Sequence, residues 1–193
     1  HPRVRRQRQM CIRDRLVCHC SPTLAGLKTG SLFSCPYSSQ KMIIKEIREF
    51  NQKLTQKGIR IIPVRISDKR MLVYVYRPEK LKEDFSDEKT QIILKCKGYD
   101  CTNLSQCICR LIQKLQSDPD FPHEIGLFLG YPAEDVKGFI ENKAACSKCS
   151  GCWKVYGDEQ AARILFKKYK KCTEIYCRRW KSGVAVEQLT ITI

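Results

Sequence analysis

The strongest constraint on the fold is a pair of β-branched and aromatic runs, residues 59–66 and 71–76, on either side of Asp68-Lys69. Runs of this length and composition, separated by a short polar turn, predict the two strands of a hairpin. Residues 31–35 predict a further strand. The N-terminal half is therefore expected to form a small antiparallel sheet.

Helical spacing of apolar residues dominates the rest of the chain. Ser21-Pro22 is expected to open a short helix, because Ser can cap a helix and Pro suits its first turn. A second helix is capped by Ser38-Ser39 and ends before Gly58. Further helices are expected at 87–95, 104–115, 123–129, 133–142 and 159–181, and a short strand at 152–156. These elements predict an α+β fold with a mainly helical C-terminal half, in one domain over 16–193 with a soft boundary near 84–88.

The charge of the chain favours anionic partners. It has 193 residues, with 36 Lys and Arg against 20 Asp and Glu, and 42% of its residues are hydrophobic. This hydrophobic content suits a folded core. The basic balance favours nucleic acid or an acidic protein as a partner. No apolar run approaches the roughly 20 residues needed to span a membrane, so no membrane partner is expected.

Residues 1–15, HPRVRRQRQMCIRDR, do not resemble a targeting segment, since no apolar run of signal-peptide length follows them. They resemble a translated transposase sequencing adapter. We therefore expect an artefactual segment outside the natural fold, and the net charge falls from +16 to +11 without its six arginines and one aspartate. A natural basic arm that binds nucleic acid is the alternative.

Cysteine is unusually frequent, with 13 in the chain and 12 of them after residue 15. A chain of this size with an ordinary core does not need disulfides to fold. Free thiols in a reducing cytoplasm are therefore expected, where metal binding and redox chemistry compete with plain burial.

The sequence CSKCSGC places Cys146, Cys149 and Cys152 at two-residue gaps. This spacing lets a loop wrap thiolates around zinc or an iron–sulfur cluster. Cys172, Cys177 or Cys20 could supply a fourth ligand. If 159–181 is one helix, Cys172 and Cys177 lie about 140° apart around its axis and cannot easily share an ion. A redox thiol pair and incidental structural cysteines remain the alternatives.

Cys20 lies directly before the helix predicted to open at Ser21-Pro22. A helix N-terminus stabilises a thiolate, so Cys20 is a candidate reactive thiol, with His19 beside it. Lys28 and free N–H groups could instead hold an anion. The alternative is an ordinary capped helix with Cys20 packed inward.

Residues 124–140 match the glycine and apolar pattern of a helix-turn-helix, with Gly130 at the turn. A recognition helix presents its first turn to DNA. Here that turn carries Glu134 and Asp135, and only Lys137 and Lys143 favour phosphate. A packing motif is therefore the competing interpretation.

The last long helix carries a basic face opposite its apolar residues. Such a face can follow a phosphate backbone, although it can equally be a solvated surface. The candidate nucleic-acid-binding residues on this helix are Arg163, Lys167, Lys170, Lys171 and Arg178.

Established catalytic motifs are missing from the sequence. There is no HExxH, Walker loop, GxGxxG or GxSxG. A Cys20 nucleophile with His123 as base is conceivable, but nothing in the sequence brings the two together. The sequence leans against an enzyme.

Four phrases together resemble one family: HCSPTLAGLKTGSLFSC, FPHEIGLFLGYPAEDVKGFIENK, GCWKVYGDE and KKYKKCTEIYCRRW. It is the bacterial family known as the domain of unknown function number 3793, found mainly in anaerobes, and the likeness covers 16–193. In that family the first phrase lies close to the start, which implies that only a short piece precedes it. The resemblance implies a cytosolic bacterial protein and supplies no activity.

Three functions follow from the residues. The first is a cysteine-rich, metal- or redox-linked binding or regulatory protein. The second is a nucleic-acid-binding protein that uses the helix-turn-helix-like motif and the basic last helix. The third is a thiol-dependent enzyme built on Cys20.

Overall fold

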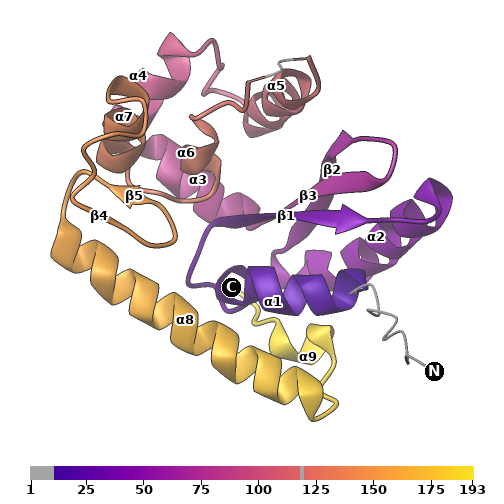
Figure 1. Cartoon of the computed structure of the whole chain (residues 1–193). Coiled ribbons are helices and arrows are strands. Elements are labelled where there is room, and N and C mark those ends of the chain that lie inside the picture. The colour runs from indigo at the N-terminus through magenta and orange to yellow at the C-terminus, as the bar shows by residue number, and fades with distance from the viewer. Residues whose placement is uncertain (1–10, 118–119) are drawn as a thin grey trace, which may run out of the picture.

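The computed structural model describes residues 11–117 and 120–193 and places a small sheet between two groups of helices (Figure 1). The first ten residues of the predicted artefactual segment lie outside the described part. The strands of the sheet are β1 (Gly30–Pro36), β2 (Arg60–Ile66) and β3 (Arg70–Tyr76).

The three strands form an antiparallel sheet in the order β1-β3-β2. The predicted hairpin is confirmed, because β2 and β3 pair directly and Ser67 N–H donates to Arg70 O across the turn. The register of β2 shifts between Pro63 and Arg65. Proline has no N–H for a ladder, and an edge strand is where a sheet tolerates it.

The remaining elements are helices and one small hairpin, which confirms the α+β class and the helical C-terminal half. The helices are α1 (Ile12–Leu24), α2 (Gln40–Leu54), the 3₁₀ turn η1 (Thr55–Lys57), α3 (Pro78–Ser86), α4 (Glu88–Cys96), α5 (Leu104–Ser117), α6 (Ile125–Phe128), α7 (Ala133–Glu141), α8 (Glu159–Lys181) and α9 (Val186–Leu189). The hairpin is β4 (Cys149–Ser150) with β5 (Lys154–Val155). In the described part, no helix combines the length and apolarity that crossing a membrane requires.

Strand β3 is buried on both of its faces. Met71, Val73 and Val75 join a core with α1, α2 and α9, whereas Tyr74 and Tyr76 join a second core with α3 to α7. Successive side chains of a strand point to opposite faces. One strand therefore supplies the centre of both cores, and the helices cover the sheet on both sides (Figure 1).

Helix α1 differs from its prediction, because it begins at Ile12 instead of Ser21. Leu16, Val17, Cys20 and Leu24 form its buried face, and this packing carries the helix through Pro22. The helix also crosses the boundary predicted at residue 15, and Ile12 is only 2% exposed. The artefactual origin of residues 1–15 stays a prediction.

Two other boundaries were predicted too wide. The helix expected at 123–129 is one turn, α6, because turns precede it at His123-Glu124 and follow it at Leu129-Gly130. The strand expected at 152–156 is β5, which pairs with β4 over two residues. The boundary near 84–88 falls between α3 and α4, which both pack into the second core.

The loop between α1 and β1 lies directly against the turn between α6 and α7. A Cβ on Gly30 would lie 2.6 Å from Phe128 O, and one on Gly130 would lie 2.7 Å from Thr29 Oγ1. Gly130 also has φ +76°, which favours glycine. Thr29 Oγ1 in turn donates to Asp84 Oδ2 at 2.5 Å. This close approach fixes the position of Lys28, the residue before Thr29.

Candidate nucleic-acid interface

Helix α8 is a long rod along one side of the molecule, from the β4–β5 hairpin to α9 (Figure 1). Asp158 begins it by accepting a hydrogen bond from Ala161 N–H at 3.0 Å, a common helix N-cap. Tyr169 and Cys172 are buried on the side that packs against the protein, and α1 is its main helical neighbour. The opposite side faces solvent.

All five predicted cations of α8 are exposed. Arg163, Lys167 and Lys170 follow one another at spacings of four and three residues, which places them in one stripe along the helix. Arg163 forms an ion pair with Glu159 at 2.7 Å. In residues 11–117 and 120–193, no ion pair is formed by the other four, Lys167, Lys170, Lys171 and Arg178. Their charge is thus available to an anionic partner.

An open groove of about 520 Å³ runs beside this stripe, between α8 and α1. Below, it is called the α1–α8 groove. Of its lining residues, Lys28 and Lys170 are cationic and Glu174 is acidic. Its other lining residues are His19, Pro22, Ser31, Cys152, Phe166, Tyr169, Thr173 and Cys177. The groove thus combines two cations with the rings of Phe166 and Tyr169.

Lys28 is the half-buried cation of the groove. Its Nζ lies 5.1 Å from the centroid of the Tyr131 ring, within cation–π distance. Burial lowers the pKa of Lys28 from its ordinary value, and the neighbouring Cys152 and Cys20 oppose this shift. A half-buried ammonium is poorly hydrated, so an incoming phosphate would displace little water from it.

The thiols of the CSKCSGC loop have separate surroundings. Cys146 is exposed at φ +56°, beyond the end of α7. Cys149 interacts electrostatically with Arg163, whereas Cys152 interacts with Lys28 in the groove. Burial raises the pKa of Cys152, and Lys28 only partly offsets this, so the thiol form is favoured.

Of the two candidate ligands on α8, Cys177 lines the same groove as Cys152, whereas Cys172 does not. Cys172 is buried, and burial raises its pKa to about 11. Cys177 interacts with the thiol of Cys18 on α1. Across the described residues, no three His, Cys, Asp or Glu side chains form a group that could hold a metal ion. Zinc or cluster binding stays a prediction, which metal analysis of anaerobically purified protein would test.

Cys20 lies in the interior of α1 and not before its first turn, so the N-terminal argument for a thiolate does not apply. The side chain is fully buried, and burial raises its pKa far above the ordinary value. Ser21 donates its hydroxyl to Val17 O within the same helix. These surroundings match the packed alternative.

The helix-turn-helix-like pair is formed by α6 and α7, and its helices are held together by packing. Gly126 leaves room for Val136, which would lie 2.8 Å from a Cβ at that position. In the first turn of α7, Glu134 pairs with Lys89 and Asp135 is buried. Lys137 pairs with Glu141 at 3.8 Å, and Lys143 lies beyond the helix end at φ +48°. Neither lysine joins the α8 stripe.

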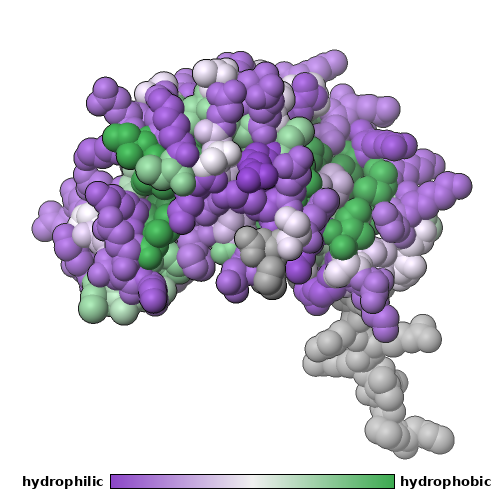
Figure 2. All heavy atoms as spheres, turned by 90° about the horizontal axis from the view of Figure 1, so that it is seen from above, coloured by the Kyte–Doolittle hydropathy of each residue, from purple (hydrophilic) through white to green (hydrophobic). Residues whose placement is uncertain are grey.

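Part of the surface beside α7 is apolar, where α7 and α4 line a groove together. Ile92 is 62% exposed on α4, at a groove that Ile140 of α7 lines from the other side. Figure 2 looks down on this side and shows a hydrophobic patch where α4 and α7 lie, within a mostly hydrophilic surface. A DNA-reading helix needs a positive surface there. The geometry therefore matches the packing interpretation of the motif.

Two features of the region were missed from the sequence. One is the close approach of Lys28 to Tyr131, which depends on residues about a hundred positions apart. The other is an aromatic hollow lined by Tyr131, Phe139 and Trp153. The frequent aromatic residues between 121 and 156 were the only available signal.

Comparison with known proteins identifies a family and no relative of known activity. No curated protein sequence and no solved structure matches the chain. The family described as "Protein of unknown function (DUF3793)" matches residues 16–190, which include the α1–α8 groove and the helix-turn-helix-like pair. The chain therefore belongs to the DUF3793 family.

Proposed function

We propose that the protein binds nucleic acid through phosphate groups laid along the exposed stripe of α8. The observation that carries this proposal is the availability of Lys167, Lys170, Lys171 and Arg178 on one helix, exposed and without ion pairs in the described residues. Cations that are free to neutralise phosphates release the counterions condensed on the nucleic acid. Cations already paired within the protein release few of them.

The α1–α8 groove supports the same function. It is lined by the half-buried Lys28 and the exposed Lys170, so positive charge continues from the stripe into the groove. Phe166 and Tyr169 add ring surfaces beside these cations. Because nucleic acid is intracellular, the proposal retains the cytoplasmic location expected from the sequence.

The test is the salt dependence of binding to a labelled single-stranded oligonucleotide. The triple variant Lys167→Gln/Lys170→Gln/Lys171→Gln removes three exposed cations from α8, two of them in the stripe. If each cation accounts for about 0.7 in the slope of log K against log salt, the slope should fall by about 2. Affinity at low salt should fall with it.

A control variant with the same change in charge is Lys41→Gln/Lys69→Gln/Lys95→Gln. These three lysines are exposed, lie away from α8 and form no ion pair in the described residues. The control should keep the slope of the unmodified protein. Equal slopes for the two triple variants, or no retention of any strand at low salt, would overturn the proposal.

A further inference from the structure

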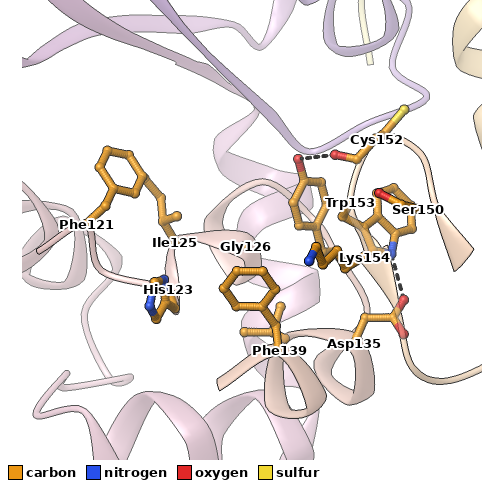
Figure 3. A pocket seen from close by; sticks show the side chains of 12 residues that line it. Phe121, His123, Ile125, Gly126, Asp135, Phe139, Ser150, Cys152, Trp153 and Lys154 are labelled. Atoms are coloured by element: carbon orange, nitrogen blue, oxygen red, sulfur yellow. Dashed lines mark hydrogen bonds between the residues drawn. The ribbon is translucent and has the colours of Figure 1, made fainter. Parts of the chain in front are cut away.

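A second hollow, of about 290 Å³, lies beside the groove (Figure 3). Phe121, Tyr131, Phe139 and Trp153 are among its lining residues, and it is called the aromatic pocket below. Its volume is near the lower end of the range of about 300–1,000 Å³ common for small-ligand pockets. A flat ring system of modest size suits such a space.

The walls of the aromatic pocket are held in place before any ligand arrives. Trp153 donates its indole N–H to Asp135 Oδ2 at 2.6 Å, and Tyr131 stacks on Trp153 with ring centroids 4.7 Å apart. Phe139 meets the His123 ring edge-on at 5.0 Å. Fixed aromatic walls spare a ligand the entropy cost of ordering them.

Polar groups on the pocket suit the edge of a base. His123 and Ser150 both line it, and neither side chain makes a hydrogen bond within the described residues. Figure 3 shows His123 on the side of Phe121, away from Ser150 on the hairpin. Asp135 is not available, because its Oδ1 accepts the backbone N–H groups of Tyr156 and Gly157 at 2.7 Å.

The aromatic pocket and the α1–α8 groove share a wall. Cys152 lines both. Tyr131 lines the pocket, and its ring also contacts Lys28 of the groove. A cation that faces phosphate is thus one aromatic ring away from a space that fits a base. A single strand presents its phosphates and unpaired bases at such a separation, whereas a duplex hides the faces of its bases in the stack.

We propose that the aromatic pocket takes one unpaired nucleobase of a single strand whose phosphates follow Lys28 and the α8 stripe. The base lies against Tyr131 and Phe139, and His123 and Ser150 offer polar groups to it from opposite sides. This inference rests on the proposed function, and it specifies the substrate class as single-stranded nucleic acid.

The experiment uses Trp153 as the reporter. The chain has two tryptophans, so Trp180→Phe leaves Trp153 alone. An oligothymidylate strand, an abasic strand of equal length and a duplex are each added at low salt, with labelled-strand anisotropy recorded beside Trp153 emission. We expect all three to bind, but only oligothymidylate to quench Trp153.

The variant Phe139→Ala should weaken oligothymidylate binding about tenfold, which lies within the usual contribution of one stacked base. It should leave the abasic strand unaffected. Phe139 is half-buried at the pocket, so its loss should not unfold the protein. Ile92→Ala on α4 is the control, since Ile92 is exposed and outside both hollows.

The outcomes separate the two proposals. Equal binding of the abasic and base-bearing strands, with Phe139→Ala silent, would overturn the pocket and leave phosphate binding intact. Thymidine monophosphate binding as tightly as the oligomer would overturn the single strand as ligand. If no strand binds at low salt, the proposed function fails together with this inference.

Discussion

Trp153 and Asp135 form a buried hydrogen bond of 2.6 Å between the indole N–H and Oδ2. It joins the cysteine-bearing hairpin to the second helix of the helix-turn-helix-like pair. Asp135 is 3% exposed and its other oxygen accepts two backbone N–H groups at the end of β5. A residue that resembled a misplaced acid in a recognition helix is therefore the anchor of the aromatic pocket.

Replacing Asp135 with Asn should loosen this hairpin. An amide has one acceptor oxygen, so at least one of the three donors loses its partner. Hydrogen bonds to charged groups contribute about 1.5–3 kcal/mol each, so the free energy of unfolding should fall by about 2 kcal/mol. Denaturant unfolding measures the fall. Glu134→Gln, at the exposed neighbouring position, should cost less than about 1 kcal/mol; an equal loss in both variants would contradict the anchoring role.

Local patterns predicted most of the fold. The run Met71–Tyr76 alternates between two faces, and both of them turned out to be core. Helix α8 followed from its apolar spacing and the Asp158 cap. Helix α1 was the exception, because Pro22 was taken as a first-turn residue when it is actually near the helix end. Tertiary packing of Leu16 and Val17 outweighed that local signal.

The site was less predictable, because it depends on contacts between distant residues. The exposure of the α8 cations followed from the helical period alone. In contrast, the spacing of Cys146, Cys149 and Cys152 does not reveal how their loop is held. The hydrogen bond from Trp153 to Asp135 does that, and it joins residues 18 positions apart. The groove likewise is lined by Lys28 and Lys170, which lie on segments far apart in the sequence.

The buried pair of Glu124 and Lys114 should make stability depend on acid. Lys114 Nζ lies 2.7 Å from Glu124 Oε1, and Tyr99 O–H donates to the same oxygen. Burial raises the pKa of Glu124, but the hydrogen bond and charge of Lys114 outweigh it, so the net pKa is lowered from 4.5. A lowered carboxyl pKa stabilises the fold above the unfolded value.

That stabilisation should disappear as the pH falls below about 4.5 towards the folded pKa of Glu124. The variant Glu124→Gln has no charge to lose. The difference in free energy of unfolding between the two proteins should therefore be largest near neutral pH and shrink in acid. Urea titrations across this range measure it, and a difference that does not change with pH would contradict the assignment.

Thiol reactivity should follow exposure and not the cysteine motif. Cys96, Cys109 and Cys146 are exposed, whereas Cys20 and Cys172 are buried with raised pKa values. Alkylation of native protein near pH 8, read by mass spectrometry, should label the first three and spare the last two. Unfolding in denaturant should make all five reactive. Rapid, selective labelling of Cys20 near neutral pH would contradict this order and support the thiol enzyme.

Substitution of Gly130 should disturb the contact between the two loops more than its backbone angle alone explains. Gly130→Ala puts a methyl group 2.7 Å from Thr29 Oγ1 at φ +76°. Gly183→Ala is a matched control, because Gly183 has φ +93° and nothing lies within 4 Å of its Cβ position.

The left-handed conformation costs an L-residue about 1–2 kcal/mol at either position. Only Gly130→Ala adds a clash, which overpacking data put at about 1–3 kcal/mol more. Urea unfolding should therefore show a larger loss for Gly130→Ala. Its oligonucleotide affinity should fall as well, because Lys28 moves with Thr29 away from Tyr131. Equal losses in the two variants would show that the loop contact does not position the groove.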